Sequence, residues 1–138
     1  MNQQYRSIEY WNKILAMDPN NKVILTRAGD AYRNTGDYET AEKYYNKAMD
    51  IDFDIYAALG LALICKGKGE YNEAIERLSS LVRNDPKNYR PYIDIADCYL
   101  KMNKKNDAIE ALKTYQRQGI RSQAINDMID RLQNEKTA

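Results

Sequence analysis

Residues 28–48 read AGDAYRNTGDYETAEKYYNKA, and this stretch decides the fold because its pattern recurs twice further along the chain. The second copy, residues 61–81, reads LALICKGKGEYNEAIERLSSL, and the third, residues 95–115, reads IADCYLKMNKKNDAIEALKTY. The fifth residue of each copy is an aromatic or thiol anchor, namely Tyr32, Cys65 or Tyr99, which recurs every 33 or 34 residues. Self-similarity at this period is typical of helical solenoids, and stacked repeats favour binding over catalysis.

Turn residues separate segments in which apolar side chains recur at helical spacing. Residues 18–21 and 85–88 both begin with Asp-Pro and have the form of interhelix turns. Gly36 and Gly69 stand where a left-handed C-cap is needed, and Asp37 can cap the helix that follows Gly36. We therefore predict eight helices, at residues 4–17, 21–35, 38–51, 54–67, 71–84, 88–102, 105–118 and 122–135.

The repeated residues resemble the tetratricopeptide repeat, whose pattern has W-x2-L-G-x2-Y, then A-x3-F, then P. The matching residues of the first copy are Leu25, Ala28, Gly29, Tyr32, Gly36, Tyr38, Ala41, Tyr45 and Ala48. Those of the second are Ala58, Leu61, Ala62, Cys65, Gly69, Tyr71, Ala74, Leu78, Leu81 and Pro86. Those of the third are Tyr92, Ile95, Ala96, Tyr99, Ala108, Leu112 and Tyr115. Asn103 and Lys105 depart from the Gly and Tyr of the turn.

The fold that this resemblance implies is an all-α, right-handed helical solenoid that forms a single domain over residues 1–138. We expect repeats at residues 21–54, 55–88 and 89–121. A half repeat at residues 4–19 precedes them, and a capping helix at residues 122–135 follows them.

Composition excludes several classes of function. The chain has 138 residues, a formal net charge of +1 and no histidine. Without histidine, it lacks the residue that most often serves as a general base and as a transition-metal ligand. Its near-zero net charge gives no electrostatic reason to expect binding to nucleic acid or a membrane. The longest apolar run, residues 55–65, is too short to span a bilayer. We expect no enzyme activity, no cofactor and no metal, and a cytoplasmic location is the default.

The resemblance implies a groove lined by the first helix of each repeat. The residues expected there are Arg27, Asp30 and Arg33, then Leu59, Leu63 and Lys66, then Arg90, Ile93, Asp94 and Asp97. Val23, Thr26 and Gly60 belong to the same face. The groove would bind a protein or peptide segment that carries Lys or Arg beside apolar residues. The clamp that some family members use for a terminal carboxylate is not expected, because Asp30 and Asp94 would repel it. Leu59 and Leu63 are either open to a partner or covered by neighbouring helices.

Two other functions stay open. Helix 4–17 resembles the second helix of a repeat that lacks its first, so Ile8 and Trp11 could associate with a second chain at this edge. A monomer in which Trp11 packs onto helix 21–35 is preferred over such a homodimer. Alternatively, the chain could be a regulatory domain of a larger protein.

Overall fold

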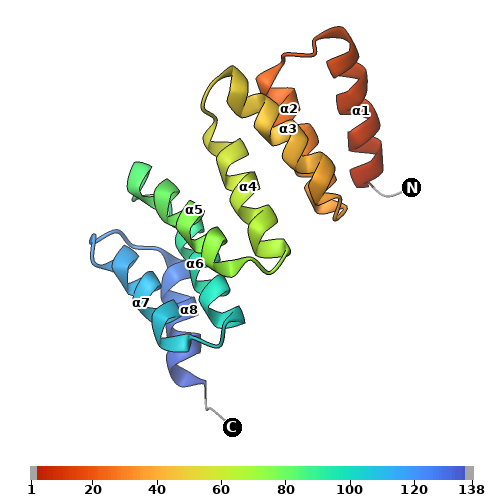
Figure 1. Ribbon diagram of the computed structural model, residues 1–138. Helices are drawn as coiled ribbons and strands as arrows, with labels where there is room; N and C mark the ends of the chain where they lie inside the picture. Colours follow the sequence, from red (N-terminus) through yellow and green to blue (C-terminus); the bar gives the residue numbers. More distant parts are fainter. Residues whose placement is uncertain (1–2, 136–138) are drawn as a thin grey trace. The chain divides into compact units, whose positions relative to one another are not determined.

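The computed structural model describes residues 3–135, with side chains from residue 6 onward. Over these residues it contains eight helices and no strand (Figure 1). They are α1 (Gln3–Met17), α2 (Lys22–Asn34), α3 (Tyr38–Ile51), α4 (Ile55–Gly67), α5 (Tyr71–Asn84), α6 (Arg90–Lys101), α7 (Lys105–Gln116) and α8 (Gln123–Asn134). Each bound lies within two residues of its prediction, so the all-α prediction is confirmed.

The predicted capping and turn residues explain where the helices begin and end. The Asn21 side chain accepts a hydrogen bond from the Ile24 amide at 3.2 Å, and Asp37 caps α3 in the same way. Gly36 has a φ of +86°, which a residue with a Cβ adopts only at a cost. Asn103 takes the equivalent turn with a φ of +61°, as the residue type best able to replace glycine there.

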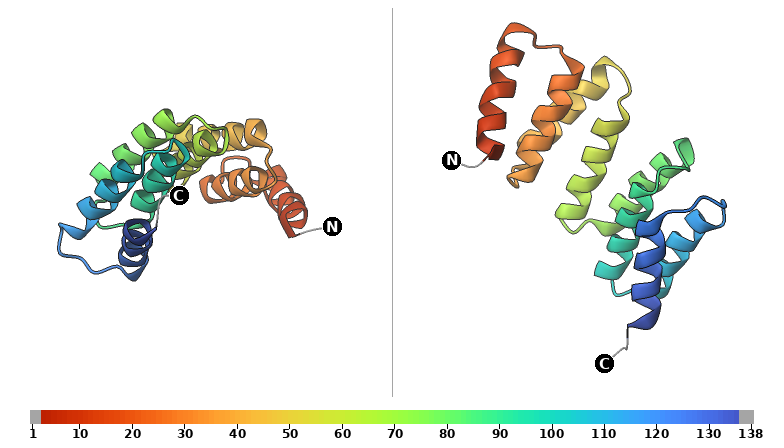
Figure 2. Two further views of the ribbon diagram at one scale, coloured as in Figure 1. Left: turned by 90° about the horizontal axis from the view of Figure 1, so that it is seen from below. Right: turned by 180° about the vertical axis from the view of Figure 1, so that it is seen from behind.

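The chain divides into two compact units, Met1–Lys68 and Gly69–Ala138, and each is described by itself. The single-domain organisation therefore stays a prediction. In unit 1, helices α1 to α4 follow one another as antiparallel neighbours (Figure 2). Its core is Leu25, Ala41, Tyr45, Ala48, Ala57 and Ile64. Ala41 is fully buried, as expected for the small residue at a close helix crossing.

Unit 2 contains helices α5 to α8 and a core of its own. The core is Tyr92, Ala96, Ala108, Leu112, Tyr115, Ile125, Met128, Ile129 and Leu132. The last four of these residues form the apolar face of α8, so the terminal helix buries that face against α6 and α7, as a capping helix must. None of the helices in the described part of the chain combines the length and the apolar character that crossing a membrane requires.

Candidate functional site

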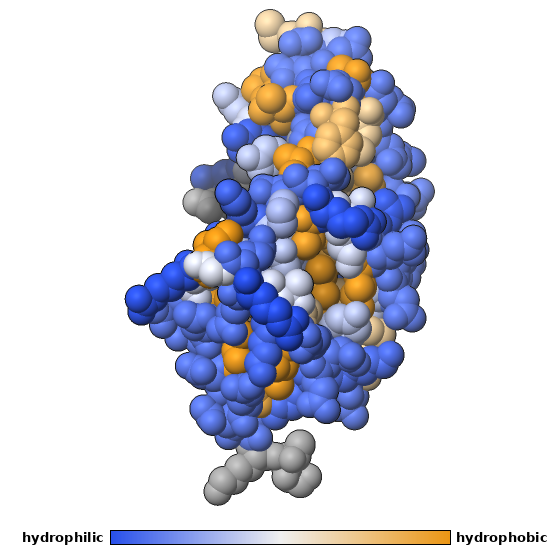
Figure 3. Space-filling view, turned by 90° about the vertical axis from the view of Figure 1, so that its left-hand side faces the viewer, coloured by the Kyte–Doolittle hydropathy of each residue, from blue (hydrophilic) through white to orange (hydrophobic). Residues whose placement is uncertain are grey.

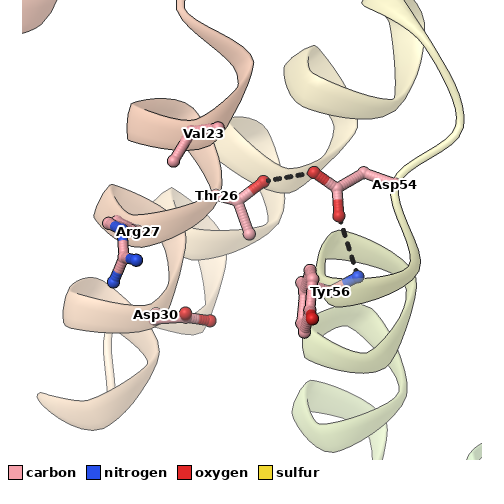
Figure 4. A pocket seen from close by; sticks show the side chains of 6 residues that line it. All are labelled: Val23, Thr26, Arg27, Asp30, Asp54 and Tyr56. Atoms are coloured by element: carbon pink, nitrogen blue, oxygen red, sulfur yellow. Dashed lines mark hydrogen bonds between the residues drawn. The ribbon is translucent and has the colours of Figure 1, made fainter.

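A cavity of about 410 Å³ lies between α2 and the beginning of α4 in unit 1 (Figure 4). Its lining is Val23, Thr26, Arg27 and Asp30 from α2, with Asp54 and Tyr56 from the start of α4. All four residues from α2 belong to the face that the sequence predicts to line the groove. Val23 is 56% exposed and Tyr56 is 71% exposed, so two large apolar surfaces border the cavity without cover.

Hydrogen bonds fix the rim where α2 meets α4. The buried Thr26 hydroxyl donates to Asp54 Oδ2 at 3.2 Å. The other oxygen of Asp54 accepts from the amide of Tyr56 at 2.8 Å, which makes Asp54 the N-cap of α4 (Figure 4). Asp54 thus links the Thr26 side chain on α2 to the N-terminus of α4 at the rim of the cavity.

Tyr45 of α3 extends between α2 and α4, and two glycines make room for its ring. A Cβ added at Gly29 would lie 2.6 Å from the ring atom Cε1, and one added at Gly60 would lie equally close to Cε1 and Cε2. Contacts this short do not occur between real atoms, so the ring depends on the absence of side chains at both positions. Gly60, predicted to face the groove, is instead buried against Tyr45.

The Tyr45 hydroxyl connects two of the predicted groove residues. It donates a hydrogen bond to Asp30 Oδ1 and accepts one from Arg33 Nε at 3.1 Å. Arg33 Nη2 also lies 3.6 Å from the same Asp30 oxygen. Burial, together with the hydrogen bond to Asp30, raises the pKa of Tyr45 well above its ordinary range, because both favour the protonated hydroxyl. The cluster holds Asp30 at the cavity wall.

The remaining predicted residues of unit 1 have different positions. Leu59, Leu63 and Lys66 are half-buried on α4, and they lie outside the lining of the cavity. Trp11 and Ile8 are also half-buried, while Tyr10 is 57% exposed and packs edge-to-face on Trp11 at 4.8 Å.

Unit 2 contains a second cavity of about 380 Å³, between α6 and α8. Ile93 and Asp97 line it from α6, as predicted, and Ala124, Asp127, Met128 and Arg131 line it from α8. Asp94 is half-buried, and the Arg90 guanidinium lies 5.9 Å from the ring centre of Tyr89.

Sequence reasoning missed Asp54 and Tyr56, which line the cavity of unit 1, and the residues of α8 that line the cavity of unit 2. An Asp directly before an apolar helix is the signal that could have identified Asp54 as a cap facing α2. The contribution of α8 was missed because the prediction gave this helix a capping role alone and placed only the first helix of each repeat at the groove.

Comparisons with known proteins identify the family to which the fold belongs. Two family models described as tetratricopeptide repeat match the chain, at residues 24–55 and 67–122. The chain is 27% identical over 101 residues to Superkiller protein 3 of Schizosaccharomyces pombe, and this match covers 72% of the chain and 7% of that protein. The chain spans only 7% to 11% of the length of the curated relatives that it matches.

Solved structures show the same fold. MamA from Desulfovibrio magneticus RS-1 has a TM-score of 0.74 at 17% identity, covering 95% of this chain and 75% of its own. A tetratricopeptide repeat protein from Parabacteroides merdae has a TM-score of 0.69 at 19% identity, covering 96% of this chain and 65% of its own. The two family matches, together with the helix pattern and the glycine-lined helix crossing, show that the chain belongs to the tetratricopeptide repeat proteins.

Proposed function

We propose that the protein is a non-catalytic module that binds a segment of a partner protein on the α2/α4 face of unit 1 and the α6/α8 face of unit 2. Tetratricopeptide repeats are typically interaction modules, which is the general basis for this function. The observation that carries the proposal is the unit 1 cavity, where exposed Val23 and Tyr56 flank fixed polar groups. An apolar surface with a few oriented polar groups is what a recognition site requires.

The partner segment that suits both faces carries Lys or Arg beside an apolar side chain. In unit 1 the cavity has two carboxylates, Asp30 and Asp54, against one guanidinium, Arg27. In unit 2 it has Asp97 and Asp127 against Arg131. Hydrogen bonds orient Asp30, Asp54 and Asp127. Counted over the lining residues alone, each cavity has a formal excess of one negative charge, which would favour association with a cationic segment and make it sensitive to salt. Arg33, which pairs with Asp30, lies outside this lining.

Peptide titration of the whole chain tests the proposal. One short peptide alternates Lys with Leu, and its matched control replaces each Lys by Glu. We expect the Lys peptide to bind more tightly, with affinity falling as salt rises, and to shift the backbone amide resonances of α2, α4, α6 and α8. Tighter binding of the Glu peptide, or shifts confined to α5 and α7, would contradict the proposed faces.

A second candidate function is self-association at the N-terminal edge. The observation in its favour is the edge-to-face pair of Tyr10 and Trp11, of which Tyr10 is mostly exposed. Light scattering at rising concentration, on the native chain and on Trp11→Ala, distinguishes it. A dimer that Trp11→Ala dissociates would support this edge, whereas a monomer at every concentration excludes it. Because the curated relatives are much longer, either function could also operate inside a larger protein.

A further inference from the structure

Exposed apolar side chains are concentrated at one end of unit 1. Six large hydrophobic side chains are exposed in the described part of the chain, and five of them fall in residues 17–23 and 50–56. These five are Met17, Val23, Ile51, Phe53 and Tyr56, with exposed fractions from 46% to 89%. Single exposed apolar residues are ordinary on a protein surface, but a cluster of them marks an interaction site.

Helix topology explains why these two segments share one end. The chain passes from α1 to α2 within residues 17–23, and from α3 to α4 within residues 50–56. Because consecutive helices are antiparallel, both connections lie at the same end of unit 1, the upper end in Figure 1. The Lys22 ammonium lies 3.7 Å from a carboxylate oxygen of Asp52, and this ion pair joins the two connections directly. Apolar atoms are exposed at the corresponding upper end of the space-filling view (Figure 3).

The charge at this end has a consistent sign. The two segments contain four aspartates, Asp18, Asp50, Asp52 and Asp54, against the single Lys22, for a formal charge of −3. The whole chain has a formal charge of +1, so the negative charge is local to this end. An apolar surface bordered by carboxylates is complementary to a segment that combines cationic and apolar side chains.

We propose that residues 17–23 and 50–56, here named the loop end, form a second docking surface that binds a basic, apolar segment of a partner protein. This surface extends beyond the α2/α4 cavity, with which it shares Val23, Asp54 and Tyr56, half of the residues that line that cavity. Met17, Ile51 and Phe53 do not line that cavity, and they belong to the loop end alone. A partner could therefore contact both surfaces, or the loop end by itself.

The test uses the whole chain, the labelled Lys-Leu peptide and its Glu-Leu counterpart, with binding followed by fluorescence anisotropy. Phe53→Ser and Met17→Ser remove apolar surface from the loop end, and Asn72→Ser changes an exposed side chain on α5, outside every proposed binding surface. We expect each loop-end variant to weaken binding of the Lys-Leu peptide by roughly three- to tenfold, and Asn72→Ser to leave it unchanged. Asp50→Asn should weaken binding by about twofold at low salt, while Glu42→Gln, an exposed change on the same helix, should not.

Several results would overturn the loop end as a docking surface. Equal effects of Asn72→Ser and Phe53→Ser would do so, as would preferential binding of the Glu-Leu peptide or no binding at all. A dimer of the native chain that Phe53→Ser dissociates would assign the surface to a second copy of this chain instead. Binding that shifts α2, α4, α6 and α8 but is unaffected by Phe53→Ser and Met17→Ser would reject the loop end and leave the proposed function intact.

Discussion

Replacing Gly60 by Ala should destabilise the protein, although the same change stabilises most helices. In an open helix interior, Gly to Ala contributes about 1 kcal/mol of stability. Here the new Cβ would lie 2.6 Å from two atoms of the Tyr45 ring, which is fully buried and cannot swing into solvent. Overpacking of this kind costs about 1–3 kcal/mol, and contact with rigid ring atoms places Gly60→Ala at the upper end. We expect a net loss of about 2 kcal/mol in the free energy of unfolding.

Urea unfolding followed by fluorescence measures this loss, because Trp11 is the only tryptophan and lies in unit 1. The control is a double-mutant cycle with Tyr45→Leu, which removes the ring that the new methyl group meets. In that background Gly60→Ala should be neutral or stabilising. The reasoning fails if Gly60→Ala stabilises the native chain, or if it destabilises both backgrounds equally.

Three further predictions concern a helix cap, the cavity rim and the Tyr45 cluster. Asp37→Ala should cost about 1 kcal/mol in urea unfolding because it removes the N-cap of α3, whereas Lys104→Ala, at an N-cap position with no side-chain capping bond, should cost little. Thr26→Val should cost about 1 kcal/mol through loss of the hydrogen bond to Asp54, and an unchanged unfolding midpoint would show that the rim is not held this way. The pKa of Tyr45 is raised above the ordinary value of 10.0, so the folded state holds this proton more tightly than the unfolded state. The free energy of unfolding should therefore fall as pH rises above about 10, and Tyr45→Phe should reduce that slope when unfolding is compared across this pH range.

The helices could be predicted because their ends depend on local chemistry. Asn21 and Asp37 cap their helices with their own side chains, and Gly36 adopts the backbone conformation that glycine favours. None of these signals needs tertiary contacts. Even the departure at Asn103 was predictable, since Asn is the best replacement for glycine at positive φ. The start of α6 and the end of α7 each differ from prediction by two residues, and Tyr89, the N-cap residue of α6, makes no side-chain capping bond.

The site was only partly predictable, because a helical period assigns a residue to a face by its Cα and not by the tip of its side chain. Tyr45 belongs to the buried stripe of α3, and its ring is buried as the period predicts. Its hydroxyl, however, reaches Asp30 and Arg33, two residues that the sequence predicts on the groove face of α2. The length of the Tyr45 side chain also explains Gly60. The Tyr45 ring from α3 fills the space beside α4 where a side chain at residue 60 would otherwise lie. A long aromatic side chain that packs against a glycine can therefore contribute polar atoms to a groove formed by two other helices. In this chain the Tyr45 hydroxyl of α3 does so, and the α2/α4 face depends on three helices rather than two.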